Sequence, residues 1–527
     1  MKKLIYFSIL GLSLLGLNSC DDFLKEEPRS QISVDQFYAN SADAFSAVNN
    51  LYRNGFPSFY NASVYAGTTA MYGGYISGLF DNQYKGQEKI VQDCQNLAVD
   101  ATVNNGNLLT LWQNCYIAIG RANNAIKYIP TTPGLAAADA NKLQAEAKFF
   151  RALNYFHLVK MFGGVPKITD PYESLENLYI EKSPVADIYN LIVEDLKYAI
   201  EQGGLADVPM PKNGFRISKG SASALLADVY LNMSGQPLNV NKYAEAATVA
   251  KSIIGNSNYA LIQNGSTPET SAYNTLRTSD NESEYLYVIE YDATISNGSA
   301  RPTFCFPNEA ATWGEFTYSI CNLAYRPVSQ ILAVYDKAND LRAQEKQYFH
   351  TKYTFTKGTR KGETVTFSDV TPYFWFEPNA LYTTNKSEKD QVHYRLSEMY
   401  LIAAEAIAQT SGVNAEAAGY LATIQARASM NKTKAEITAE LITLSKDDFI
   451  KEVWKEKIRE LIFENKIWND ITRTRMYPTV KDGVFTFVPI VGAQNPWGKT
   501  FTEKNLLFPF PNDEMQRNPK LVQNPGY

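Results

Sequence analysis

The stretch MYGGYISGLFDNQYKG at 71–86 combines four aromatic rings with four glycines and carries one acidic and one basic side chain. Glycine raises the entropy cost of ordering a backbone, so rings on such a segment need an explanation. Four kinds of structure fit this composition: a phosphate-binding loop, a metal-binding loop, a buried strand, and a platform of rings for a ligand.

The spacing of residues excludes two of these structures. A phosphate-binding loop needs GxGxxG or GxxxxGK[ST] leading into a helix, and Gly73 and Gly74 fit neither pattern. DNQYKG at 81–86 begins like an EF-hand calcium loop, but Lys85 would place a cation where a ligand oxygen belongs, and Gln92 occupies the acidic twelfth position. A buried strand and a ring platform remain open.

Side chains for catalysis are scarce in the rest of the chain. No GxSxG or HExxH motif occurs, and His157, His350 and His393 lie far apart without a recognisable nucleophile. We interpret each as a structural histidine. No CxxC or Cys/His spacing indicates zinc, so no metal and no cofactor is expected. A glycosidase stays open, because it needs two carboxylates at a set separation rather than a motif.

The N-terminus has the features of an export signal. Lys2 and Lys3 precede an apolar run at 4–17, which is too short to span a bilayer. LNSC at 17–20 resembles a bacterial lipobox, so we expect lipidation of Cys20, whose acyl chains would contribute about 0.8 kcal/mol of membrane binding per buried CH2. A secreted protein with a cysteine here by chance is the alternative.

Four cysteines follow in the body of the chain: Cys94, Cys115, Cys305 and Cys321. An even number in an exported chain permits two disulfides, of which the simplest pairing is Cys94 with Cys115 and Cys305 with Cys321. Burial as small apolar side chains is the alternative.

Composition limits the class of ligand. The chain has 50 Lys and Arg against 55 Asp and Glu, a net charge of -5, and therefore no excess of basic residues for nucleic acid. Aromatic residues make up 13%, including 34 Tyr. A Tyr side chain has an apolar face and a polar tip, so it can fill a partly hydrated core or present a ring to a ligand.

Helices must position these side chains, because apolar residues recur at spacings of three and four in two blocks, 107–255 and 394–475. SVDQ at 33–36 has the form of a capping box that opens an earlier helix. The pattern predicts an all-α scaffold of two-helix units resembling tetratricopeptide repeats. Individual helices are expected at 110–130, 143–161, 184–199 after Ser183 as N-cap and with Pro184 as first residue, 218–233, 243–254, 395–409, 415–430 and 446–472.

Residues 256–393 interrupt the helical pattern with a segment rich in Tyr, Phe, Asn, Thr, Gly and Pro. EYLYVIEY at 284–291 alternates and predicts a strand. A structureless loop of this length is improbable, so we expect an insert with its own packing. The expected organisation is a signal peptide at 1–19, a lipidated cysteine and acidic tether at 20–30, and one domain at 31–527 that ends in an irregular segment at 476–527.

Several segments together resemble the SusD/RagB family of outer-membrane lipoproteins and occur in the family's order. The C-terminal segment keeps Phe463, Glu464, Trp468 and Asp470 of the family wording, while Asn465 and Lys466 replace Gly-His. The segments that carry the resemblance are LQAEAKFFRALNYFHLVKMFGGVPKIT (143–169), RISKGSASALLADVYLN (216–232), YRLSEMYLIAAEA (394–406), KEKIRELIFENKIWNDITRTR (455–475) and LLFPFPNDEMQRNPKLVQNPGY (506–527).

The resemblance implies about four tetratricopeptide-like helix pairs and an irregular insert that completes a glycan-binding face. It also implies a lipoprotein on the cell surface that covers a SusC-like, TonB-dependent outer-membrane transporter and delivers oligosaccharides to it. Asp21 and Asp22 resemble the signal that exports such lipoproteins to the outer face. Family members are binding proteins, so no enzymatic activity is expected.

In this family the binding rings come from a loop before the repeat helices and from the insert. A ring can stack on the C–H face of a sugar while nearby polar groups bond its hydroxyls. Trp313 is the first choice among the matching residues. The matching positions are Tyr72, Tyr75, Phe80, Asp81, Asn82, Trp313, Phe316, Tyr318 and Trp375.

Three other functions remain as alternatives to glycan capture. Some relatives handle peptides, which would favour a narrow groove lined by backbone-pairing groups. A surface glycosidase would need two close carboxylates in a cleft. A protein-interaction solenoid would retain no glycan.

Overall fold

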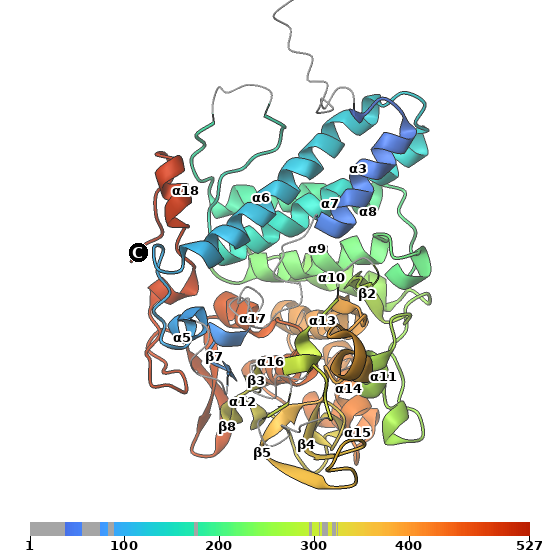
Figure 1. Ribbon diagram of the computed structural model, residues 1–527, viewed down its shortest axis with the longest axis vertical. Helices are drawn as coiled ribbons and strands as arrows, with labels where there is room; N and C mark the ends of the chain where they lie inside the picture. Colours follow the sequence, from blue (N-terminus) through green and yellow to red (C-terminus); the bar gives the residue numbers. More distant parts are fainter. Residues whose placement is uncertain are drawn as a thin grey trace, which may run out of the picture.

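The computed structural model describes residues 37–54, 74–82, 89–172, 178–292, 294, 298–304, 306–307, 315–318, 323 and 325–527. Helices dominate the described chain, and each of its sheets has two strands (Figure 1). The helix-dominated fold predicted from the sequence is confirmed. Cys20 and the expected capping box at 33–36 lie outside the described residues.

The long helices pack in succession, each against the next (Figure 1). α6 packs against α7, α7 against α8, α8 against α9 and α9 against α10. α10 then packs against α13, although the whole of 256–393 separates them in sequence. The helices are α3 (Ser41–Asn54), α5 (Lys89–Gln95), α6 (Asn105–Tyr128), α7 (Ala137–Phe162), α8 (Val185–Glu201), α9 (Lys219–Ser234), α10 (Tyr243–Ile254), α11 (Ala272–Thr278), α12 (Ser329–Leu332), α13 (Leu396–Ser411), α14 (Ala415–Ala428), α15 (Lys434–Leu441), α16 (Lys446–Leu461), α17 (Ile467–Thr474) and α18 (Asn512–Arg517).

Local signals account for the bounds of several helices. Ser218 caps α9, because its hydroxyl accepts a hydrogen bond from the Ser221 amide at 3.2 Å. The single helix predicted at 446–472 is wrong. The chain leaves α16 after Leu461, passes through Asn465 at a φ of 58°, which a right-handed helix does not admit, and resumes as α17. Pro184 is the N-cap of α8 and not its first residue.

Four antiparallel strand pairs accompany the helices in the described chain. All five side chains of β2 are buried, because it lies between β6 and α9, so the exposed face expected from its alternating sequence is absent. The pairs are β1 (Phe80–Asp81) with β3 (Arg326–Pro327), β2 (Tyr285–Ile289) with β6 (Gln391–Arg395), β4 (Phe349–Thr354) with β5 (Thr364–Pro372), and β7 (Met476–Lys481) with β8 (Val484–Pro489).

A buried cluster of charges joins the insert to the second block of helices. The Glu460 carboxylate on α16 accepts hydrogen bonds from Arg342 in the insert, Arg395 at the end of β6 and Arg427 on α14. Burial alone would raise the pKa of Glu460, but these three guanidinium groups lower it to about 2. One carboxylate therefore holds together four parts of the chain that are distant in sequence.

Two cysteines lie in the core. Cys94 and Cys115 are both buried and not bonded to each other, so of the two alternatives the structure supports burial as small apolar side chains and not the disulfide. Burial raises the pKa of both thiols well above its ordinary value. Cys305 and Cys321 lie outside the described residues.

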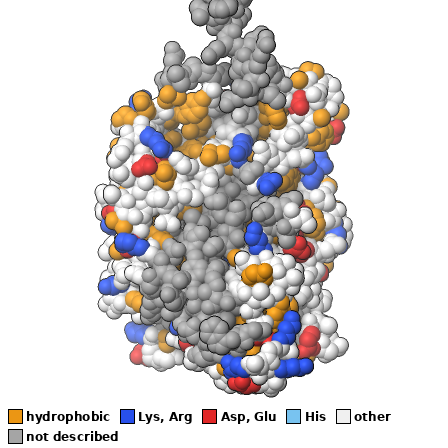
Figure 2. All heavy atoms as spheres, viewed as in Figure 1, with side chains coloured by type: hydrophobic (Ala, Val, Ile, Leu, Met, Phe, Trp, Pro, Cys, Tyr) orange, Lys and Arg blue, Asp and Glu red, His pale blue; other side chains and the backbone are white. Residues whose placement is uncertain are grey.

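The surface of the described chain carries charges of both signs. On the face shown in Figure 2, Lys and Arg are interspersed with Asp and Glu, and hydrophobic side chains gather at the upper end. In the described part of the chain, no helix is both long and apolar enough to cross a bilayer.

Candidate functional site

A row of aromatic rings joins the glycine-rich stretch to the insert. The Phe80 ring of β1 stacks on Tyr325, next to β3, at a centroid distance of 4.4 Å. Tyr325 lies 5.7 Å from Trp375, and Trp375 lies 4.7 Å from Phe463, just beyond α16. The structure therefore places Phe80 and Trp375, which the sequence analysis assigned to one site, on either side of Tyr325.

Two positions of the stretch require glycine for different physical reasons. A Cβ on Gly74 would lie 2.1 Å from the Tyr325 hydroxyl oxygen, so only glycine lets the backbone approach this ring. Gly78 has a φ of 69°, in the left-handed region that favours glycine. The glycines serve the packing of the ring row and the turn into β1.

Several rings expected to face a ligand are buried instead. Tyr75 is 0% and Phe80 1% exposed, because both pack against Tyr325. Phe316 is buried against Phe306 and Tyr353 in a second, smaller hydrophobic cluster of the insert. These positions correct the expectation that the three rings lie open to a ligand.

The polar residues of the stretch are also inside the protein. The Asp81 carboxylate accepts hydrogen bonds from Gln95 Nε2 at 3.0 Å and from Arg326 at 3.3 Å, which ties β1 to α5 and β3. Asn82 is buried beside it. The structure therefore corrects the ligand-facing role expected for Asp81 and Asn82 and makes them internal links.

The remaining predicted residues differ in their surroundings. Tyr318 is 39% exposed, and its backbone amide donates to the Leu381 carbonyl at 3.0 Å. Trp375 is half-buried and has part of its ring at the surface. Tyr72 and Trp313 lie outside the described residues.

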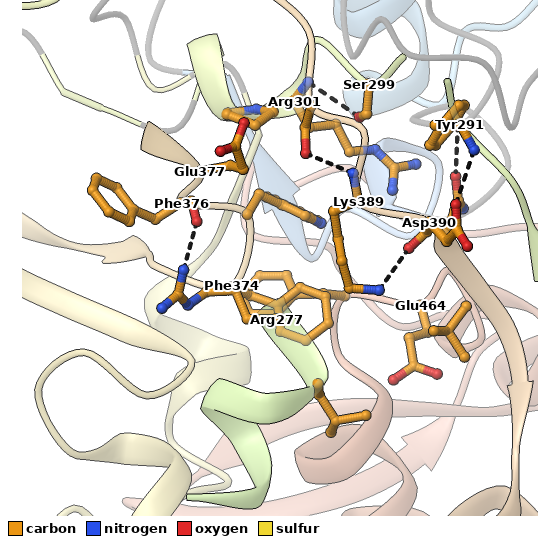
Figure 3. Close-up of a pocket in the computed structure, with 17 residues that line it drawn as sticks. Arg277, Tyr291, Ser299, Arg301, Phe374, Phe376, Glu377, Lys389, Asp390 and Glu464 are labelled. Atoms are coloured by element: carbon orange, nitrogen blue, oxygen red, sulfur yellow. Dashed lines mark hydrogen bonds between the residues drawn. The ribbon is translucent and has the colours of Figure 1, made fainter. Parts of the chain in front are cut away.

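Trp375 lines a cavity between the insert and the end of α16 (Figure 3). The cavity volume is about 60 Å³, enough for a few water molecules or one group of a larger ligand, since about 10–15 Å³ suffices for one water. Its lining is Leu276, Arg277, Tyr291, Ser299, Arg301, Pro302, Phe374, Trp375, Phe376, Glu377, Ser387, Lys389, Asp390, Gln391, Val392, Phe463 and Glu464.

Arg277 of α11 fixes the aromatic run that carries Trp375. Its Nη1 donates to the Phe376 carbonyl at 2.8 Å (Figure 3), and its Nε donates to Asn274 Oδ1 at 3.1 Å. Its guanidinium also lies 4.7 Å from the centre of the Tyr373 ring. These contacts of Arg277 hold the segment around Trp375 in place.

Arg301 contacts the same tryptophan. Its guanidinium is 5.6 Å from the centre of the Trp375 ring, within the range of a cation–π interaction. Its backbone amide donates to Ser299 Oγ at 3.3 Å (Figure 3), and Ser299 exchanges backbone hydrogen bonds of 2.9 and 2.8 Å with Ser387. A cation and an indole ring therefore meet at one wall of the cavity.

Asp390 and Lys389 also line the cavity. Asp390 Oδ1 accepts a hydrogen bond from the Tyr291 amide at 2.9 Å (Figure 3). Lys389 Nζ lies 2.6 Å from the carboxylate of Asp280, which is not part of the lining. Burial, and then the charge of Asp280, raise the pKa of Asp390 to about 7. Its carboxyl group can therefore donate or accept a hydrogen bond near neutral pH.

Glu464 completes the polar lining. Its Oε1 accepts a hydrogen bond from Arg395 Nε at 2.9 Å, while its Oε2 is buried and has no hydrogen-bond partner among the described residues. Burial raises the pKa of Glu464 to about 7, although Arg395 opposes the rise. A buried oxygen without a partner is costly, so a ligand group that bonds it would be stabilised.

The cavity suits a ligand with an apolar face and several hydroxyl groups. Rings and hydrogen-bonding side chains converge on it, and the described residues contain no group of three or more potential metal ligands. Sequence reasoning identified Trp375 but missed Tyr291, Arg301, Asp390 and Glu464. Tyr291 ended a predicted strand, and Glu464 was noted as a residue kept from the family wording, without a role in the site.

Stacked helix pairs with a ring-lined cavity in an insert define the chain as a helical-repeat protein. The chain belongs to the SusD family. Its residues 309–527 match the model of the SusD family, and residues 22–231 match a model described as starch-binding associating with outer membrane.

Relatives share this fold or its sequence over most or all of the chain. A SusD superfamily protein from Parabacteroides distasonis is 30% identical, with a TM-score of 0.80 over 92% of this chain and 99% of its own. Surface glycan-binding protein A from Bacteroides fluxus is 20% identical, with a TM-score of 0.69 over 93% and 100%. SusD-like protein P2 of Formosa agariphila is 27% identical over the full length of both chains.

Proposed function

We propose that this chain is a glycan-binding lipoprotein of the cell surface, which captures a polysaccharide or oligosaccharide and passes it to a SusC-like, TonB-dependent transporter. The cavity around Trp375 is the proposed point of capture. The observation that carries this proposal is the convergence of a half-buried indole ring, Arg301 and two carboxyl groups on one small cavity.

The chemistry of sugars fits this lining. A pyranose has a C–H face that sheds water against an aromatic ring, while its hydroxyl groups donate and accept hydrogen bonds. Asp390 and Glu464, each with a pKa of about 7, can serve as either partner. The cavity would hold one sugar group, with the rest of the glycan across its mouth.

The descriptions of relatives support the same role. One of the matching family models is described as starch-binding and associating with outer membrane, and a solved relative is described as a laminarin-binding SusD-like protein. The lipobox at Cys20 supplies the proposed membrane anchor. Binding without cleavage is the proposed activity.

Affinity electrophoresis of lipid-free protein, starting at Asp21, tests the proposal in gels that contain starch or laminarin. We expect slower migration in at least one gel, and Trp375→Ala should lose about tenfold in affinity as ring stacking disappears. Trp497→Ala is the matched control, because Trp497 is a half-buried tryptophan that does not line the cavity.

Unaltered migration of the wild-type protein in every gel would count against glycan binding. Equal retention of the wild type and Trp375→Ala would remove this cavity from the proposal. Release of reducing sugar by the wild-type protein, abolished by Glu464→Gln, would show a glycosidase instead.

A further inference from the structure

We propose that a groove on the helical side of the molecule is a second saccharide site, separate from the Trp375 cavity. The groove has a volume of about 740 Å³ and lies between α6, the described residues of 166–172 and 178–180, and α18. This volume falls within the range of about 300–1,000 Å³ typical of ligand sites. Its described lining has no residue in common with the cavity of Figure 3.

The floor of the groove is one face of α6. Gln113, Ile117, Gly120 and Asn124 recur at spacings of four, three and four and share this face. Glycine inside a helix costs about 0.5–1 kcal/mol relative to alanine. A Cβ on Gly120 would meet nothing within 4 Å, so no contact in the described protein requires the glycine. Its absence of a side chain leaves the helix backbone open to a ligand.

Aromatic rings stand around this floor. Tyr172 and Tyr179 are 53% and 51% exposed, so large parts of both rings are free to meet a ligand. The Tyr116 side chain is held in place, because its hydroxyl donates to the Pro166 carbonyl at 2.8 Å and its ring lies 4.9 Å from the Trp112 ring. The groove thus offers both a rigid ring and exposed ones.

Partly buried hydrogen bonds hold the walls in place. The Ile168 carbonyl accepts from the Tyr155 hydroxyl at 2.8 Å and from Asn123 Nδ2 at 3.0 Å. On the other side, Asn518 Nδ2 at the end of α18 donates to the Ile180 carbonyl at 2.8 Å. These bonds preorganise the groove, which lowers the entropy cost of binding.

The polar groups favour a neutral saccharide over other occupants. The side chains of Gln113 and Asn124 have no hydrogen-bond partner among the described residues and flank the open backbone of Gly120. Arg517 is paired with Glu514 at 2.8 Å, and Asp170 is the other charge of the lining, so the groove has no excess of basic groups for an anionic ligand. Rings together with free amides match the C–H faces and hydroxyls of a sugar.

Isothermal titration calorimetry tests this site on lipid-free protein with two probes, a laminarin-derived hexasaccharide and maltohexaose. Trp375→Ala protein should keep binding at least one probe through the groove. Adding Gly120→Leu, which fills the floor, should weaken that remaining binding by about tenfold or more. Gly419→Leu is the matched control, because Gly419 also lies inside a helix, is partly exposed and has nothing within 4 Å of its Cβ position.

The outcomes separate the two sites. Binding of neither probe by Trp375→Ala protein would overturn the second site and, if the wild type binds, leave the proposed function intact. Unchanged binding after Gly120→Leu would also overturn the second site. The same holds if Gly120→Leu leaves saccharide binding unchanged but reduces co-purification with a transporter. Loss of all binding on Gly120→Leu alone would support the groove and remove the Trp375 cavity.

Discussion

The position of the Trp375 ring depends on residues that do not line its cavity. Tyr325 packs against Trp375 on one side and Phe80 on the other, and the Tyr325 hydroxyl occupies the space beside Gly74. Any side chain at position 74 must displace a ring that is itself 5% exposed. Gly74 therefore affects the position of the Trp375 ring through Tyr325.

Gly74→Ala should destabilise the protein by about 1–3 kcal/mol, as expected for overpacking of a tight core. It should also weaken glycan binding, because a displaced Tyr325 would shift the Trp375 ring that packs against it. Chemical denaturation and affinity electrophoresis measure the two effects. Gly419→Ala should instead leave binding unchanged and stabilise α14 by about 0.5–1 kcal/mol. Equal behaviour of both variants would contradict this account.

The residue types of the site were easier to predict than their exposure. Composition and family resemblance selected rings near residues 80 and 375, and the structure places them on one row. Neither could show that Phe80 would be covered by Tyr325, because burial depends on a partner 245 residues further along the chain. Asp390 and Glu464 gave no local signal at all, since their raised pKa values arise from tertiary burial.

The helices were easier to predict than the exposure of the site residues, because the sequence signals of a helix are local. The bounds of α10 agree with the predicted 243–254, where periodicity and a following glycine mark both ends. The break between α16 and α17 was missed, because it depends on the left-handed backbone of Asn465 within an otherwise helical pattern. α15 was also missed, a helix of eight residues whose capping box, Thr433 with Glu436, is visible in the sequence.

The contact between insert and helices rests on the buried charges around Glu460. Glu460→Gln should lower the free energy of unfolding by about 3–5 kcal/mol, because Arg342, Arg395 and Arg427 would lose their shared counter-charge inside the protein. Denaturation monitored by tryptophan fluorescence measures the change.

Glu440→Gln is the control for this prediction. Glu440 pairs with Lys432 at the surface, where the two side chains are 59% and 46% exposed, so its loss should change the stability by less than about 1 kcal/mol. A similar small effect of both substitutions would show that the buried cluster does not hold the insert in place.

At the scale of the whole molecule, the helices form the scaffold and the insert supplies the cavity. Helices α10 and α13 pack against each other across the insertion point, so the scaffold is continuous without 256–393. The insert can therefore vary in sequence and supply a cavity without disturbing the stacked helices. The groove on α6 uses the scaffold itself, and two separated sites would let one long glycan gain avidity that a short one lacks.

The proposed capture at the cell surface requires that the whole domain be held at the membrane, and LNSC at 17–20, which resembles a lipobox, makes the Cys20 sulfur the proposed point of attachment. Cys20→Ala should abolish labelling by radioactive palmitate in a lipoprotein-processing bacterial host and move the protein from the membrane fraction to the soluble fraction. The reason is that the acyl chains on Cys20 are the proposed anchor. Asn18→Ala keeps Leu17, Ser19 and Cys20 and should leave labelling and fractionation unchanged. Membrane association of Cys20→Ala would mean that the protein is held by a partner instead, and co-purification of the unlipidated protein with the transporter would then identify the contact that holds it.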